Sequence, residues 1–569
     1  MKRAPGQVVG FFLLVTSGVT GCSGGDPRAG LPEGAGRDAS GTAPFAPETR
    51  SLPSYRALRP GADLDRAAAL AAALGLTREG FARGAALAPD GAIRYLDRAR
   101  FQRVPTRKAA PPAPGFRDER GLATARGDDA IDLDALAAAR VLPGPDAVAR
   151  ARDALDAARL PVGREVAVGH SLFEVSDLEG REVARAELDT QVNFRETLEG
   201  LRLIGPGAKV KVTFDPEGVV THLLYAFREL ERGEDVAIVP PSEAAALCAA
   251  ALGEGAAPAA EPELVYYAPP LSSDARWILP HYVCSARRRS GEEEVDVRKV
   301  IVPAALGAPA AAVSALSTRL RGAAARSEEP RPTAPAPGQG AQGTVGAEWV
   351  GRCGGLSHSK ANVDGMLARF QASGIGPRFN WGDHRAWEVD FKDPALGGQD
   401  VSFADSVDLT FYTGHANGSG FMFCTNMSDG FLHFTDARWG NAELEWMVVA
   451  ACGPLQDDAG AWRYRWAGAF DGLHLLLGYA TESFDDTTEG AAFAGRLLDE
   501  ASPAPLRQAW ATTAIEVQPD DQVIYAVMGV YGPDWTLPNY EDHFWGMGPV
   551  GPDLRGAEKL GFWRISGKT

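Results

Sequence analysis

The chain has 569 residues, 45% of them hydrophobic, and a formal net charge of −17 from 57 basic and 74 acidic side chains. Its length exceeds one ordinary domain of roughly 100 to 200 residues, so we expect two globular units. The acidic balance excludes a nucleic-acid-binding protein, because no basic patch in the sequence offsets it and no DNA- or RNA-binding motif is present.

The amino terminus has the pattern of a secretion signal, a basic start followed by an apolar stretch too short to span a bilayer. Residues 19–22, Val-Thr-Gly-Cys, resemble a bacterial lipobox, which implies that Cys22 is diacylated and becomes the new first residue. We therefore interpret residues 1–22 as a lipoprotein signal and residues 23–60 as a flexible tether. Ser23, where an acid would signal retention, favours the outer membrane or the surface of a bacterial cell envelope. Lipid is the only membrane contact we expect.

Residues 61–322 are predicted to form an α+β domain. Ala- and Leu-rich stretches at 62–90 and 128–160 have helical spacing, and alternating strand patterns follow between residues 166 and 302. Residues 192–207 combine an aromatic strand, a Gly-bearing turn and an apolar-Gly-x-Gly run, and resemble PepSY and thermolysin-propeptide modules. This resemblance implies a folding aid or an intramolecular inhibitor of a secreted peptidase. An α+β module without an inhibitory role is the alternative.

Residues 323–345 are rich in Pro, Gly and Ala and predict a linker between the two units. Residues 346–569 then alternate apolar strands with helices, one of which carries apolar residues at helical spacing from Val363 to Phe370. Continuous apolar strands separated by helices predict an α/β fold of three layers, with a mostly parallel sheet covered on both faces.

Two of these strands end in side chains that can act together. Residues 407–414 lead to His415, and residues 444–451 lead to Cys452. A cysteine nucleophile needs a nearby base, and open α/β sheets bind ligands at the carboxyl ends of their strands. The pattern therefore predicts a cysteine–histidine dyad. A buried core cysteine and a loop histidine are the alternative interpretation.

The strand ends Gly-His and Ala-Cys resemble clan CD cysteine peptidases, the caspase, legumain and gingipain group, over residues 345–569. The resemblance implies a caspase-like fold and an oxyanion hole formed by the N–H groups of Ala416 and Cys452. Ala416 stands where glycine is usual, and Ala450 where many members carry an acid or glutamine. An uncharacterised bacterial lipoprotein family, sharing these ends and a strand like residues 472–478, is more similar but implies no activity.

Peptide-bond hydrolysis is the activity that follows from the dyad and the resemblance. Cys452 would attack a peptide or protein substrate, with His415 as base and then as acid to the leaving amine. We expect no cofactor and no metal, since no two histidines beyond residue 345 have zinc-like spacing; a metal site is the weaker alternative. A non-catalytic binding or scaffold lipoprotein on a degenerate peptidase fold is the alternative; a hydrolase or transferase of non-peptide acyl groups is a third. Intramolecular inhibition would make a fragment starting near residue 345 react faster than the full chain.

Five cysteines remain besides Cys22. Cys248 can pair with Cys284 and Cys353 with Cys424 in an oxidising envelope, which would leave Cys452 as an accessible free thiol; no bridge at all is the alternative. Aromatic residues near the dyad strands would line a substrate cleft or pack beneath loops: Trp381, Trp387, Trp462, Tyr464 and Trp466. Asp457 and Asp458 would select basic substrate side chains or form a solvated turn.

Overall fold

The computed structural model describes residues 48–60, 62–76, 86–87, 90–109, 129–273, 275–306, 343–425 and 430–569. The predicted signal with Cys22, most of the tether and nearly all of the linker lie outside the described residues. Those described belong to one compact unit, Pro44–Thr569. Among the helices in the described ranges, none has the length and apolar character needed to cross a bilayer.

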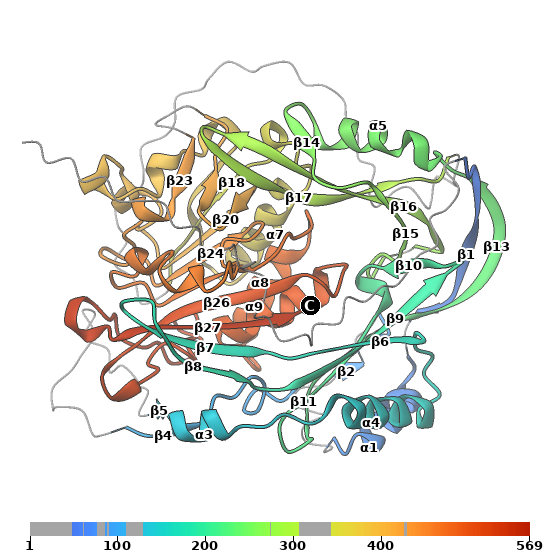
Figure 1. Ribbon diagram of the computed structural model, residues 1–569, viewed down its shortest axis with the longest axis horizontal. Helices are drawn as coiled ribbons and strands as arrows, with labels where there is room; N and C mark the ends of the chain where they lie inside the picture. The colour runs from blue at the N-terminus through green and yellow to red at the C-terminus, as the bar shows by residue number, and fades with distance from the viewer. Residues whose placement is uncertain are drawn as a thin grey trace, which may run out of the picture. The chain divides into compact units, whose positions relative to one another are not determined.

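The dyad strands belong to a nine-stranded sheet (Figure 1). Its order is β19 (Pro377–Gly382), β18 (Val345–Trp349), β20 (Leu409–Thr413), β24 (Trp446–Ala450), β25 (Leu475–Tyr479), β26 (Ile524–Tyr531), β27 (Gly561–Lys568), β7 (Leu172–Asp177) and β8 (Glu182–Glu187). The strands from β19 to β25 run parallel, and each later pairing is antiparallel. The sheet is therefore mixed, with its parallel part beneath the dyad.

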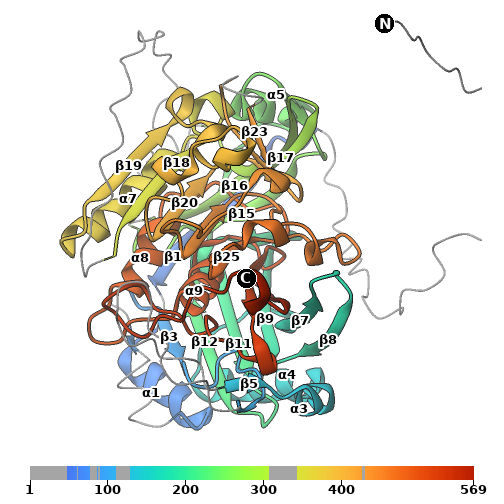
Figure 2. The same ribbon diagram turned by 90° about the vertical axis from the view of Figure 1, so that its left-hand side faces the viewer.

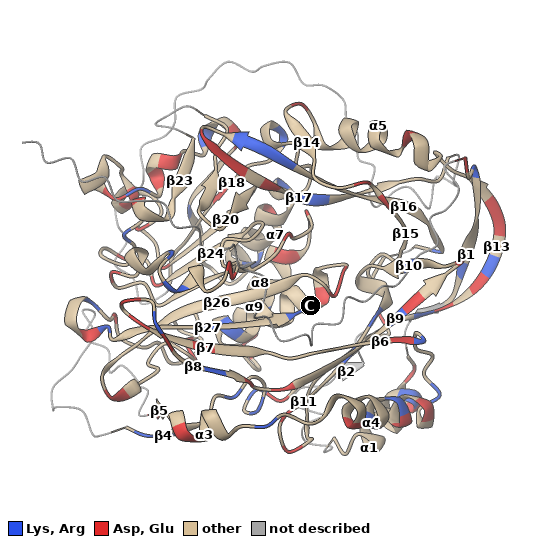
Figure 3. Cartoon of the chain, viewed as in Figure 1, with Lys and Arg blue, Asp and Glu red and all other residues tan. Residues whose placement is uncertain are grey.

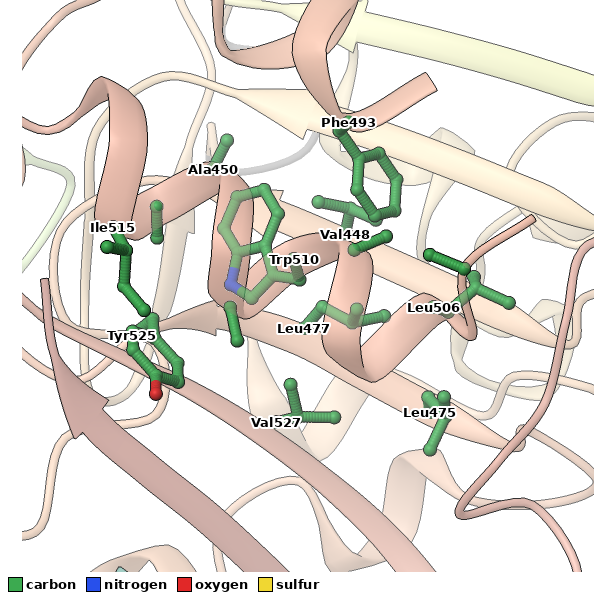
Figure 4. Packing of buried hydrophobic residues seen from close by; sticks show 14 of the residues in the cluster. Val448, Ala450, Leu475, Leu477, Phe493, Leu506, Trp510, Ile515, Tyr525 and Val527 are labelled. Carbon is green, nitrogen blue, oxygen red and sulfur yellow. The ribbon is translucent and has the colours of Figure 1, made fainter. Parts of the chain in front are cut away.

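Helices cover one face of this sheet. They are α7 (Ser359–Ala372), α8 (Glu489–Leu497) and α9 (Leu506–Val517), and they share one hydrophobic core with every second residue of β20, β24 and β25. Figure 4 shows Trp510 and Phe493 packed on Val448 and Leu477. Each strand is five residues long and buried throughout, as the apolar runs predict.

The opposite face carries loops with short 3-10 turns instead of the second helical layer that the sequence predicts. Tyr412, Met447 and Leu476 point to this face and form a separate core. Its largest side chains come from loops, including Trp439, Trp462 and Trp466. Aromatic side chains thus do there what a helical layer would do, which is to exclude water from the sheet.

The amino half is built on a second sheet. Its main path is β2 (Ala86–Leu87), β3 (Ile93–Leu96), β12 (Val220–Ala226), β11 (Lys209–Phe214), β9 (Thr190–Leu198), β10 (Leu201–Ile204), β15 (Glu263–Tyr267), β16 (Trp277–Ser290), β17 (Glu293–Pro303), β21 (Ala416–Asn417), β22 (Gly420–Met422) and β23 (Phe431–His433). Off this path lie β1 (Ser51–Pro60), β6 (Glu165–Gly169), β13 (Arg228–Ala237) and β14 (Ala256–Pro258), and a separate pair joins β4 (Thr106–Lys108) to β5 (Asp129–Ile131).

The amino half contains the helices α1 (Leu64–Ala73), α3 (Leu133–Ala138), α4 (Gly144–Ala157) and α5 (Pro241–Leu252). The first three lie in the stretches predicted to be helical, although Ala86–Leu87 and Asp129–Ile131 of those stretches form strands. The side chain of Asp63 accepts from Arg66 N–H at the start of α1, and that of Asp132 accepts from Ala135 N–H at the start of α3, so both are N-caps. Helices α1 and α4 lie side by side in both views (Figures 1 and 2).

The two halves share structure on both sides of the predicted linker. Strands β7 and β8 come from the amino half and extend the dyad sheet beyond β27. Strands β21 to β23 come from the carboxyl half and extend the other sheet beyond β17. Phe173 and Val175 of β7 also lie in the same core as α9. The linker at 323–345 therefore does not divide two independent cores.

Candidate active site

His415 lies just beyond the carboxyl end of β20, and both of its ring nitrogens are engaged. Nε2 is 2.7 Å from the carbonyl oxygen of Gly354, and Nδ1 is 3.3 Å from the backbone nitrogen of Arg298. A carbonyl only accepts and a backbone N–H only donates, so the proton is on Nε2 and the lone pair on Nδ1. Nδ1 is therefore the atom that can act as a base. Gly354 permits this contact, since a Cβ there would lie 3.0 Å from Nε2.

Cys452 occupies the matching position on the next strand. Thr413 of β20 pairs with Ala450 of β24, and His415 and Cys452 each follow two residues later. The thiol is held by Ser483, whose backbone N–H donates to Sγ at 3.3 Å. Ser483 lies beyond β25, the next parallel strand, in the loop that leads to α8. Three neighbouring strand ends thus supply the imidazole, the thiol and a donor to the sulfur.

Strand β17 of the amino half covers these strand ends. Asp296 pairs with Ala416, directly after the histidine. Three residues along, Lys299 N–H donates to the carbonyl oxygen of Ser483 at 2.8 Å, and its own carbonyl accepts from Asp485 N–H at 3.0 Å. His415 and Cys452 are consequently 0% exposed. The prediction of an accessible thiol is wrong for this conformation, because a strand separated by about 150 residues of sequence lies over it.

Arg298, at the centre of this covering segment, extends its side chain into the carboxyl half. Its Nη1 donates to Thr413 Oγ1 at 3.0 Å and to the carbonyl oxygen of Ala450 at 2.9 Å. Its Nη2 lies 3.3 Å from a carboxylate oxygen of Glu489, and both side chains are 0% exposed. The guanidinium therefore binds the last residues of both dyad strands and the first residue of α8.

Burial sets the protonation states of the dyad. It raises the pKa of the Cys452 thiol to about 12 and lowers the pKa of His415 to about 4. At neutral pH the pair consists of a neutral thiol and a neutral imidazole. A reactive cysteine requires a thiolate, so the pair is unreactive while β17 covers it.

The loop that holds the Gly354 carbonyl is fixed from two directions. A disulfide joins Cys353 to Cys424, and Arg288 of β16 donates to the Cys353 carbonyl at 3.1 Å. The second disulfide, between Cys248 and Cys284, lies within the amino half. Both are the pairings that the sequence suggests, and Cys452 is the free cysteine of the described residues. Asp383 lies within 4.8 Å of both sulfurs of the first disulfide, but oxidised sulfurs cannot serve as thiolate ligands to a metal.

The other predicted lining residues do not join the site as a group. Trp462 and Trp466 are fully buried in the loop core, and Trp381 packs with Phe379. Tyr464 is 61% exposed. Asp458 pairs with Arg465 and Asp457 accepts from Gly460 N–H, so these acids form local turn contacts. Ser483, in the loop after β25, is the residue that does contact Cys452.

Two residues at the centre of the site escape the sequence analysis, Arg298 and Glu489. The first lies in an alternating strand whose charged residues are expected to face solvent, and the second begins a helix where an acid is common. Asp296 and Arg298 are both charged positions of an alternating run, so the sequence gives no signal that distinguishes Arg298. In the structure Arg298 lies between Val297 and Val300, where the pairing of β17 with β16 is irregular.

Comparison with known proteins shows a similarity that is confined to the dyad half of the chain. Residues 347–567 match the family described as "Domain of unknown function (DUF6345)". The crystal structure of an uncharacterized protein from Eubacterium rectale ATCC 33656 is similar over 46% of this chain and 85% of that chain, at 14% identity and a TM-score of 0.25. That score is too low to support an argument about the fold. None of the curated proteins matches. The dyad half of the chain, His415 and Cys452 included, is thus similar to the DUF6345 domain.

Proposed function

We propose that this chain is a lipid-anchored cysteine peptidase of the bacterial cell envelope, in a latent state in which β17 covers its dyad. One observation supports this most directly. The Nδ1 lone pair of His415 accepts a backbone N–H from an extended strand, directly beside the strand end that carries Cys452. A peptidase base must reach a backbone nitrogen of its substrate in the same way, because it protonates the leaving amine.

The reaction follows from these positions. With β17 displaced, the Cys452 sulfur attacks the substrate carbonyl carbon while its proton passes to His415 Nδ1. The carbonyl oxygen becomes an oxyanion, for which the N–H groups of Cys452 and Ala416 are the proposed donors. The peptide C–N bond then breaks as the amine takes the proton from Nδ1, leaving a thioester on Cys452. Water hydrolyses the thioester, with Nδ1 again accepting and returning a proton, and releases the acid.

Latency is part of the proposal. The raised pKa of Cys452 and the lowered pKa of His415 both result from burial, so both should return toward ordinary values when water reaches the site. Arg298 N–H would also leave Nδ1 free to accept the thiol proton. Displacement of β17 would therefore expose the Cys452 thiol to solvent, shift both pKa values and free the Nδ1 lone pair of His415.

A non-catalytic scaffold is the second candidate, favoured by the complete burial of Cys452 and the ion pair beneath it. Such a protein would keep β17 in place permanently. Peptide hydrolysis after β17 has been released separates the peptidase from the scaffold.

The experiment uses full-length Arg298→Ala, cut at a protease site introduced within residues 307–342 so that the carboxyl end of β17 is released. Iodoacetamide should label Cys452 at least about tenfold faster than in the cut wild type. Arg56→Ala, an exposed arginine on strand β1 that pairs with Glu231 and not with β17, is the matched control and should not change the rate. A mixed peptide pool should be hydrolysed, and Cys452→Ala should abolish this. Labelling without any hydrolysis would support the scaffold.

A further inference from the structure

Among the described residues, the hydrogen-bond and ion-pair partners of the Arg298 side chain, which form its pocket, all come from the carboxyl half. The guanidinium contacts Thr413, Ala450 and Glu489, each of which follows the predicted linker, whereas Arg298 precedes it. The pocket lies directly beneath the dyad, because Thr413 and Ala450 are the last residues of the two dyad strands. An arginine is therefore bound where a substrate side chain next to the reacting bond would enter.

Glu489 is held in position by groups other than Arg298. Asn362 of α7 donates to its carboxylate at 3.1 Å, Gln518 donates at 3.1 Å, and the Tyr479 hydroxyl donates as well. All of these side chains are buried. Such fixed donors maintain a carboxylate in one orientation, so the pocket presents a preorganised negative charge. The planar guanidinium of Arg298 fits this carboxylate better than an ammonium group would.

The backbone on both sides of Arg298 is bound in an extended form. Asp296 pairs antiparallel with Ala416, and Lys299 exchanges hydrogen bonds with Ser483 and Asp485. These contacts use main-chain atoms, so any extended peptide can make them, and only the central side chain is selected. Strands β16 and β17 form a hairpin, and side chains of opposite charge lie along its two strands (Figure 3). Arg287 of β16 pairs with Asp296 of β17 in this hairpin.

We infer that this pocket is the specificity site of the proposed peptidase and that its substrates are peptides with an arginine next to the cleaved bond. Arg298 of β17 occupies the pocket as an internal mimic of that substrate arginine. The inference rests on the proposed function for its catalytic part, while binding of a guanidinium requires only the pocket. Lysine should bind less well, because a single ammonium cannot donate simultaneously to Thr413, the Ala450 carbonyl and Glu489.

Binding is tested first, without catalysis, in full-length Arg298→Ala, Cys452→Ala. Ethylguanidinium replaces the atoms that the substitution removes from the arginine side chain. At about ten times its Kd, it should raise the Tm by about 1–2 °C, whereas ethylammonium should not. Adding Glu489→Gln should remove the effect. If the variant does not fold, its refolding yield in the two compounds provides the same comparison. Equal Tm values or yields in both compounds would overturn the inference.

Activity provides the second test, in the cut Arg298→Ala protein with a peptide library. Peptides with arginine should be cleaved about 100-fold faster than matched norleucine peptides, and Glu489→Gln should abolish that preference. Cleavage without preference for arginine would overturn the specificity and leave the peptidase standing. Binding of ethylguanidinium by a protein that neither cleaves peptides nor reacts at Cys452 would remove the peptidase and confirm only the guanidinium pocket.

Discussion

The guanidinium of Arg298 and the carboxylate of Glu489 form an ion pair at 3.3 Å with both side chains fully buried. The two residues come from opposite sides of the predicted linker, so the pair joins the halves of the protein beneath the dyad. Removing one partner of a buried pair leaves an uncompensated charge, which is more costly than losing both.

Arg298→Met alone should therefore lower the free energy of unfolding by about 3–5 kcal/mol. The double variant Arg298→Met, Glu489→Gln should recover a large part of that loss, because no buried charge remains. Urea unfolding of both variants, with Arg287→Met as the exposed control, measures the difference. A double variant as unstable as the single one would show that the carboxylate is not the cause.

The disulfide between Cys353 and Cys424 should influence His415 directly, because Gly354 follows Cys353 and accepts from the imidazole. Cys353→Ser, Cys424→Ser should cost about 2–4 kcal/mol and shift the imidazole NMR signal of His415. Cys248→Ser, Cys284→Ser is the matched control, with a similar cost and no shift. An unchanged His415 signal in the first variant would show that other contacts hold the loop.

Acid should destabilise the protein through its buried neutral histidines. Burial lowers the pKa of His415 and of His281 to about 4, and that of His222 to about 3. Each is protonated in the unfolded chain below about pH 6.5 but not in the folded one, so stability is present above pH 6.5 and falls as the pH drops toward 4. His415→Asn should reduce this loss by up to about 1.4 kcal/mol per pH unit. Urea unfolding of the wild type and of His415→Asn between pH 7 and pH 4.5 tests this prediction. An identical change of unfolding free energy with pH in the two proteins would contradict a buried, neutral His415.

A fragment covering residues 345–569 should not fold on its own, contrary to what the predicted linker suggests. It would expose the edge of β27 that pairs with β7 and the core that receives Phe173 and Val175. We expect aggregation or noncooperative unfolding, and recovery when a fragment of residues 48–306 is coexpressed. A monomeric fragment with a cooperative transition would show that β7 and β8 are dispensable.

Cys22 lies outside the described residues, but its lipobox makes a separate prediction. Cys22→Ser should move the protein from the membrane fraction to the soluble periplasm or the medium, because no acyl chain is attached. Membrane fractionation and metabolic labelling with palmitate measure the change. Persistent membrane association of the variant would require another anchor.

Local patterns in the sequence predict the strands of the dyad sheet well, because a buried parallel strand is a short continuous apolar run. The adjacency of His415 and Cys452 follows from those runs and is seen in the pairing of Thr413 with Ala450. Contacts between distant segments leave no such local pattern. Neither the position of β17 over the dyad nor the pairing of β27 with β7 could be predicted, because both depend on surfaces that form only in the folded chain.

The pairing of β27 with β7 also determines when the protein can finish folding. Arg564 of β27 and Glu174 of β7 form a buried ion pair at 2.6 Å between residues that are 390 apart in sequence. As the chain is synthesised, the β7–β8 hairpin is complete early but keeps an open edge until the ribosome has added residue 568. Such an edge can pair with another nascent chain. Folding of the dyad sheet is thus delayed to the end of synthesis, and a chaperone that shields β7 during this interval should raise the yield of native protein.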